Sequence, residues 1–178
     1  MPTGHVFIAT SLDGFIARPD GKLDWLIRPE HEGEDHGYDA FMADIDAIVM
    51  GRGTYEAVMG FDAWPFDKPV LVLSRTLAAT PVPDSLREQV TFADLSPQAA
   101  MDHMARLGAA RVYVDGGQIV QAFLRAGLVA DIILSRIPVL IGSGRSLFGA
   151  LDRDLPLIHQ ATTAFPSGLV QSRYAIAV

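Results

Sequence analysis

The chain has 178 residues, of which 49% are hydrophobic and 20% charged, a balance typical of one globular domain spanning residues 1–178. Its formal net charge of −7 argues against binding along a nucleic acid backbone, although it permits a local basic pocket for one small anion. The absence of cysteine excludes disulfides, thiolate nucleophiles and cysteine-ligated zinc.

The apolar stretches are too short to cross a membrane. The longest of them are broken by Asp44, Asp46, Asp131 or Arg136, so none approaches the ~20 residues that a bilayer requires. The amino terminus lacks a basic region and has few apolar residues before Thr10, which indicates a first strand rather than a secretion signal. We expect a soluble, cytoplasmic protein with no membrane partner.

Strand-like runs recur along the whole chain, and most of them are rich in β-branched residues. They cover Val6–Ala9, Ala47–Met50, Val70–Leu73, Val90–Phe92, Val112–Val114, Ile132–Ser135, Leu157–Phe165 and Leu169–Ile176.

Helical patterns lie between several of these runs. They cover Asp35–Ala43, Thr54–Met59, the segment from Pro97 to Gly108 and the segment from Gly116-Gly117 to Gly127. Alternating strands and helices favour a parallel sheet covered on both faces, whereas Ala164–Leu169 is typical of a turn that closes an antiparallel hairpin. The predicted fold is therefore α/β, a three-layer α/β/α arrangement around a mixed, mainly parallel eight-stranded sheet.

Glycine turns that follow strands are the main candidate phosphate sites. In Gly51-Arg52-Gly53-Thr54, backbone N–H groups, a guanidinium and a hydroxyl can converge on a phosphate at a helix start. Gly116-Gly117-Gln118-Ile119 repeats the arrangement, and Ser74-Arg75 ends a third strand with groups suited to a 2′-phosphate. Each has a purely structural alternative, either a tight strand-to-helix turn or a solvated loop. The common GxGxxG, GxxxxGK[ST] and GxSxG signatures do not occur.

The order and spacing of the motifs resemble a known superfamily. The set comprises Ser11–Ala17, Asp24-Trp25-Leu26, Asp46–Glu56, Leu73-Ser74-Arg75, Val114–Gly117, Ile137–Gly144 and Leu147-Phe148. Together they resemble the dihydrofolate reductase superfamily, and they are most similar to the reductase domain of the bifunctional riboflavin-biosynthesis deaminase/reductase. The resemblance spans nearly the whole chain.

This resemblance implies a dihydrofolate reductase-like fold with NADPH lying across the sheet. It places Ala9 and Ile16 near the nicotinamide, Gly51–Thr54 and Gly116–Ile119 around the pyrophosphate, and Ser74-Arg75 near the adenosine phosphate. Because relatives of the riboflavin type are commonly dimers, it also implies a homodimer.

Two carboxylates are candidates for proton transfer. Asp35 lies at about the position where the folate enzymes carry a carboxylate on the helix before the glycine turn, and its alternative is a helix N-terminal carboxylate stabilised by the dipole. Asp13 precedes Gly14 in the loop expected to close over the nicotinamide, and its alternative is an Asp-Gly turn. Trp25 lies where the family motif places a side chain at the substrate cleft, and its alternative is core packing.

His31 and His36 lie among acidic residues, but their spacing matches no metal-ligand template and a charge run is usually solvated. We expect no metal.

The sequence thus predicts an NADPH-dependent reductase that transfers hydride to a small pterin-like or ribosylated pyrimidine-like substrate. The alternative is a non-catalytic nucleotide-binding or dimerisation module of the same fold. No residue pattern calls for a flavin.

Overall fold

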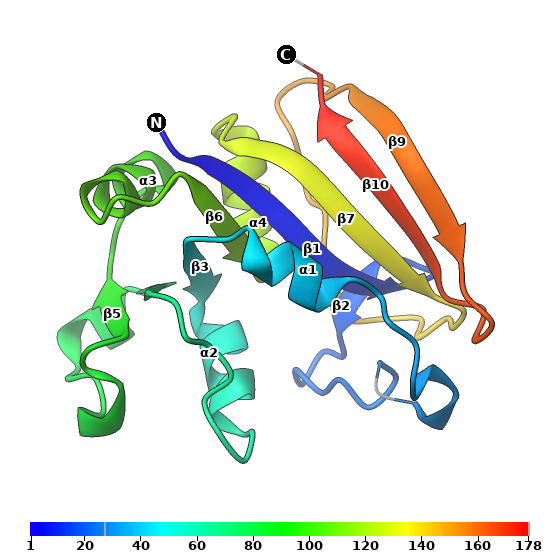
Figure 1. Cartoon of the computed structure of the whole chain (residues 1–178), viewed down its shortest axis with the longest axis horizontal. Coiled ribbons are helices and arrows are strands. Elements are labelled where there is room, and N and C mark those ends of the chain that lie inside the picture. Colours follow the sequence, from blue (N-terminus) through cyan, green and yellow to red (C-terminus); the bar gives the residue numbers. More distant parts are fainter. Residues whose placement is uncertain (27, 178) are drawn as a thin grey trace.

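A computed structural model describes residues 1–26 and 28–177, which form a mixed sheet flanked by helices (Figure 1). The strands are β1 (Thr3–Ser11), β2 (Phe15–Ala17), β3 (Ala47–Gly51), β4 (Val70–Leu73), β5 (Val90–Ala93), β6 (Arg111–Asp115), β7 (Val129–Ile137), β8 (Arg145–Ser146), β9 (Leu157–Ala164) and β10 (Val170–Ile176). The α-helices are α1 (Tyr38–Ala43), α2 (Arg52–Met59), α3 (Pro97–Arg106) and α4 (Gly117–Arg125). Short 3-10 turns cover Pro29–His31, Leu77–Ala79 and Asp84–Leu86.

Eight of the strands form one sheet in the order β5-β4-β3-β6-β1-β7-β10-β9. The pairs from β5 through to β7 are parallel, whereas β10 is antiparallel to both β7 and β9. This confirms the predicted mixed sheet with its terminal hairpin, which turns where the N–H of Phe165 donates to the carbonyl of Leu169 at 2.8 Å. β2 and β8 form a separate two-stranded sheet that the sequence did not predict.

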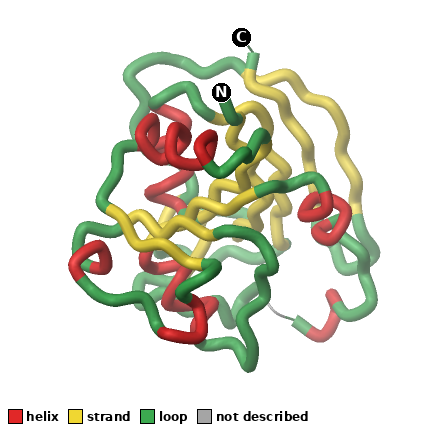
Figure 2. The backbone as a smooth tube through the Cα atoms, turned by 60° about the vertical axis from the view of Figure 1, so that its left-hand side comes forward, coloured by secondary structure: helices red, strands yellow, loops and turns green. Residues whose placement is uncertain are grey.

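Helices cover both faces of the main sheet (Figure 2). Successive side chains of a strand point to opposite faces, so Val49 packs with α3 and α4 whereas Met50 packs with α1 and α2. In the same way Val112 and Val114 face α4, and Tyr113 between them faces α1. The chain therefore has two cores, one on each side of a buried sheet, as the predicted three-layer fold requires.

Two predicted helix starts need correction. The helix expected from Asp35 begins at Tyr38, because Oδ1 of Asp35 accepts the N–H of Gly37 at 2.7 Å and Gly37 has a left-handed φ of 79°. These contacts make a turn ahead of α1 rather than its first turn. The helix expected from Thr54 begins earlier, at Arg52, directly after the extended Gly51.

Of the helices in the described residues, none is long and apolar enough to span a membrane.

Candidate functional site

Parallel strands β3, β4 and β6 end at the same edge of the sheet. Met50 of β3 is paired with Asp115 of β6, and Gly51 is paired with Leu73 of β4. Helices α2 and α4 begin directly after β3 and β6 and pack on opposite faces. Open parallel sheets bind ligands beyond the carboxyl ends of their strands. The two predicted glycine turns therefore lie where a dinucleotide is expected.

The first turns of α2 and α4 lack side-chain caps: among the described side chains, none caps α2 at Gly51 or α4 at Gly116. By contrast, Oγ of Ser96 caps α3 by accepting the N–H of Ala99 at 3.2 Å. Free N–H groups and the positive end of the helix dipole attract anions. This edge therefore presents two helix termini that suit phosphate groups.

The two glycine turns pack against each other. A Cβ atom on Gly116, whose φ is 96°, would lie 2.9 Å from Oγ1 of Thr54 and 3.6 Å from the backbone nitrogen of Gly51. A Cβ atom on Gly51 would lie 3.1 Å from Cγ1 of Ile119. Side chains at these glycines would push the turns apart. Glycine at these positions thus allows the starts of α2 and α4 to approach each other closely.

The two-stranded sheet of β2 and β8 lies over the start of α4. Phe15 pairs with Ser146 across this small sheet. A Cβ atom on Gly117 would lie 2.9 Å from Cδ1 of Ile16 and 2.8 Å from the carbonyl oxygen of Ser146. Ile16, expected near the nicotinamide, therefore lies against the second glycine turn.

Two arginines gather near the end of β4. Nη1 of Arg52 donates to Oγ1 of Thr76 at 3.5 Å, and its Nε lies 3.5 Å from the carboxylate of Glu56. Oγ of Ser74 closes the following turn by accepting a backbone N–H at 3.2 Å, and Arg75 is exposed beside it. Arg52, expected with the pyrophosphate, thus lies instead with Ser74 and Arg75 at one strand end, where the adenosine phosphate is expected.

A partly buried carboxyl group adjoins the second glycine turn. Asp115 ends β6, and its Oδ1 accepts the N–H of Gly116 at 2.8 Å. Burial raises the pKa of Asp115 to about 6, although hydrogen bonds from Gly116 and Tyr113 partly oppose that rise. A group with this pKa exchanges a proton near neutral pH, as a catalytic acid must.

Aromatic side chains surround this acid on the α1 face of the sheet. The Tyr113 hydroxyl donates to the carbonyl of Phe7 at 2.9 Å, and the Phe7 ring meets the Tyr38 ring edge-on at 5.5 Å. Burial, together with the charge of Asp115, raises the pKa of Tyr38 to about 12. Ala9 lies two residues after Phe7 on β1 and so points to the same face. The predicted nicotinamide contact Ala9 and the acid therefore share one face of the sheet.

The two carboxylates predicted for proton transfer have structural contacts. Asp13 accepts the hydroxyl of Ser11 at 2.6 Å and the N–H of Gly142 at 2.8 Å. The Ser11 hydrogen bond is the main cause of a lowered pKa for Asp13, which therefore stays ionised. Asp35 is exposed and accepts the N–H of Gly37 in the turn before α1. The lowered pKa of Asp13 contrasts with the raised pKa of Asp115.

Trp25 lies in a small hydrophobic cluster. It is 2% exposed and packs with Ile137 and Leu169. Its Nε1 is buried and has no hydrogen-bond acceptor among the described residues. The ring is therefore part of a packed core, and its role in lining a substrate cleft stays a prediction.

The sequence interpretation missed two residues at this edge. Asp115 enters the sequence interpretation only as part of the motif Val114–Gly117. An acidic residue at the end of a strand, next to a glycine turn, is a signal that could have identified it as a site candidate. Arg145 of β8 lies in no sequence motif that points to a phosphate site. Its Nη1 lies 3.2 Å from the Cβ position of Gly53, and its Nη2 lies 3.3 Å from that of Gly21.

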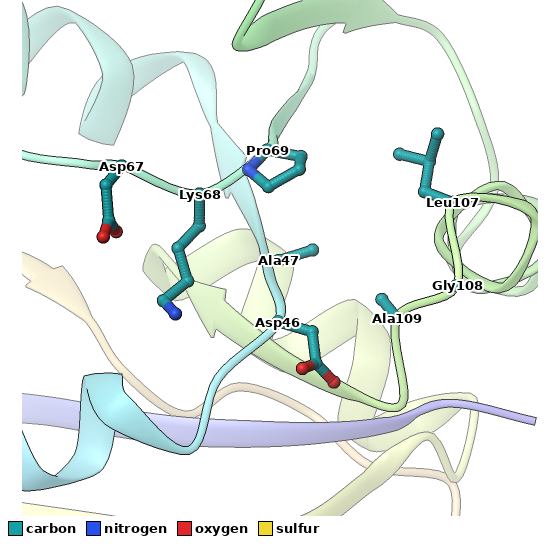
Figure 3. Close-up of a pocket in the computed structure, with 8 residues that line it drawn as sticks. All are labelled: Asp46, Ala47, Asp67, Lys68, Pro69, Leu107, Gly108 and Ala109. Carbon is teal, nitrogen blue, oxygen red and sulfur yellow. The ribbon is translucent and has the colours of Figure 1, made fainter.

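Two cavities lie elsewhere. A cavity of about 370 Å³ sits at the opposite, amino-terminal end of the sheet, where Asp46, Lys68 and Ala109 line it (Figure 3). Oδ2 of Asp46 is already engaged by the N–H groups of Ala110 and Arg111, both at 2.8 Å. A second cavity of about 340 Å³ lies between α1 and strands β7, β9 and β10. The residues of the glycine turns line neither of these cavities.

Within residues 1–26 and 28–177, no cluster of three or more histidine, aspartate or glutamate side chains has a geometry suited to a metal ion.

Comparison with known proteins identifies relatives over the full length. Residues 2–170 match the family model described as the RibD C-terminal domain. The uncharacterized protein YwjB of Bacillus subtilis (strain 168) is 35% identical over 164 residues, which cover 90% of each chain. A crystal structure of a "Putative riboflavin biosynthesis protein" from Shewanella sp. PV-4 is 37% identical, with a TM-score of 0.89 and 99% of each chain covered.

The fold also matches that of a dihydrofolate reductase. The enzyme from Enterococcus faecalis, solved in complex with NADP(H) and RAB-propyl, has a TM-score of 0.65 at 16% identity. The match covers 99% of this chain and 97% of that enzyme. The predicted dihydrofolate reductase-like fold and the riboflavin-type family are both confirmed.

Proposed function

Because the chain belongs to the family of RibD C-terminal domains, we propose that it is an NADPH-dependent reductase. The proposed substrate is a small pterin-like or ribosylated pyrimidine-like molecule that accepts hydride at an electron-poor C=N or C=O carbon. One observation carries the proposal: two glycine turns without described side-chain caps meet at one sheet edge, and a carboxyl with a pKa of about 6 adjoins them.

The residues present fit a phosphorylated dinucleotide. The uncapped starts of α2 and α4, at Gly51, Gly116 and Gly117, would hold the pyrophosphate through backbone N–H groups. Ser74 and Arg75, with Arg52 beside them, would bind the 2′-phosphate, since a guanidinium and hydroxyls suit that group. When bound, NADPH supplies the hydride. The protein then has to hold the two reactants in contact and manage one proton.

Asp115 is the residue that we propose for the proton. Its pKa of about 6 leaves a protonated fraction near neutral pH, and it faces the same side of the sheet as Ala9. A protonated carboxyl can donate to a substrate heteroatom as hydride arrives, and its ionised form can pair with a ring N–H. Tyr113, which lies on the same face of the sheet, is buried and limits the access of water.

The test is a titration of the purified protein with NADPH, followed by turnover assays on pterins, dihydrofolate and ribosylated aminopyrimidines. We expect saturable binding, quenching of protein fluorescence and substrate-dependent loss of the dihydronicotinamide absorbance.

Tight binding without turnover on any of these compounds would favour the non-catalytic nucleotide-binding module. A protein that binds no NADPH would contradict both interpretations, and a yellow protein as purified would indicate a flavin instead.

A further inference from the structure

We infer that Arg145 binds the pyrophosphate of the dinucleotide, a role that rests on the proposed function and extends it to a residue outside the glycine turns. NADPH and NADH share the pyrophosphate, whereas only NADPH carries the 2′-phosphate.

The position of Arg145 is the first argument. The pairing of β8 with β2 brings the guanidinium against the first turn of α2, where Nη1 lies 3.2 Å from the Cβ position of Gly53. On its other side the guanidinium meets Gly21, whose Cβ position is 3.3 Å from Nη2. The next residue, Ser146, places its carbonyl oxygen 2.8 Å from the Cβ position of Gly117. β8 therefore touches both glycine turns.

The charge balance is the second argument. Neighbouring cations are paired: Arg18 with Asp24 at 2.7 Å and Lys22 with Asp20 at 2.9 Å. In the described part of the chain, no acidic group lies within ion-pair distance of Arg145. The positive end of α2 repels a guanidinium placed against it. A bound anion offsets that repulsion because it is attracted both by the guanidinium and by the amino-terminal end of α2.

The direction of Arg52 separates the roles of two arginines. Nη1 of Arg52 reaches Thr76, beyond the end of β4, where the adenosine phosphate is expected. Arg145 approaches Gly53 from the β2–β8 side instead. Arg52 and Arg75 are thus placed for the phosphate that distinguishes NADPH, and Arg145 for the pyrophosphate common to both cofactors.

The experiment measures dissociation constants of wild type, Arg145→Gln and the matched control Arg153→Gln for four probes: NADPH, NADH, adenosine 2′-monophosphate and inorganic pyrophosphate. Arg153 is an exposed arginine in the segment before β9. We expect Arg145→Gln to weaken the binding of NADPH, NADH and pyrophosphate by a similar factor, about tenfold to a hundredfold, since the substitution removes a charge-assisted contact. Binding of adenosine 2′-monophosphate should not change, and Arg153→Gln should behave as wild type.

Equal affinity of wild type and Arg145→Gln for NADPH and pyrophosphate would overturn the inference. So would a loss confined to NADPH and adenosine 2′-monophosphate, because that pattern belongs to the 2′-phosphate. If wild type binds pyrophosphate through Arg145 but binds neither dinucleotide, the proposed function fails while the anion contact stands. Thermal unfolding of each variant checks that the fold is retained.

Discussion

Oδ1 of Asp115 accepts the backbone N–H of Gly116 at 2.8 Å, so this partly buried acid and the second glycine turn are joined directly by a hydrogen bond. A movement of that turn on cofactor binding would therefore change the position of the Asp115 carboxyl, the proposed proton donor.

Asp115→Asn should lower turnover with little effect on NADPH binding. The amide keeps the shape of the side chain and can still accept the Gly116 N–H, but it cannot release a proton. We expect kcat to fall by about a hundredfold or more, the scale of general acid catalysis. The measurement is kcat and the NADPH dissociation constant, with Asp39→Asn, an exposed position on α1, as the control. Full activity in Asp115→Asn would exclude the carboxyl as the proton donor.

The same substitution should stabilise the unliganded protein in a pH-dependent way. Burial raises the pKa of Asp115 from 3.8 to about 6, so the folded chain holds this proton more tightly than the unfolded chain. Stability from this group is complete below pH 3.8 and is lost as the pH rises to about 6. Urea unfolding at several pH values should show Asp115→Asn gaining on wild type across that interval, by about 1–3 kcal/mol at neutral pH. A constant difference would contradict the assignment.

Arg75→Gln should erode the preference for NADPH over NADH. Arg75 follows Ser74 at the end of β4, and a charge-assisted contact to the 2′-phosphate exists only with NADPH. We expect NADPH affinity to fall about tenfold or more and NADH affinity to stay constant. Arg52→Gln should likewise lower the affinity for NADPH more than the affinity for NADH. Unchanged discrimination in Arg75→Gln would place the 2′-phosphate elsewhere.

Gly116→Ala should destabilise the fold, and Thr54→Ala should relieve part of the loss. The new methyl group would meet Oγ1 of Thr54 at 2.9 Å and would also require a left-handed backbone with φ of 96°. Gly14→Ala has a similar φ of 87° with nothing within 4 Å, so it isolates the backbone term. We expect Gly116→Ala to cost about 1–3 kcal/mol, more than Gly14→Ala. A double-mutant cycle with no coupling to Thr54 would show that the turns do not touch.

The strands and the glycine turns were predictable because their signals are local. Runs such as Val70–Leu73 are apolar throughout, as buried parallel strands require, and Gly116-Gly117 directly follows the strand β6. The order of such motifs was enough to identify the family. The start of α1 was missed because an Asp35 turn and a helix terminus have similar sequence signatures.

The rest of the site depends on contacts between distant segments. Phe15 pairs with Ser146, and only that pairing brings Arg145 to Gly53. The raised pKa of Asp115 arises from burial, which no run of neighbouring residues encodes. The homodimer, the cytoplasmic location and the roles of Gln118 and Trp25 stay predictions.

The tether between Asp13 and Gly142 joins residues 129 positions apart, and β1 is completed only when β7 has been added beside it. Both glycine turns precede β7 in the chain, but the β2–β8 cover over them requires residues that follow it. Contacts of such long sequence separation cost loop-closure entropy and slow folding. A chain that ends before β8 would carry the phosphate turns without their cover. A dinucleotide bound as proposed would stabilise the finished chain, and its concentration would then help to determine how much of the protein survives proteolysis.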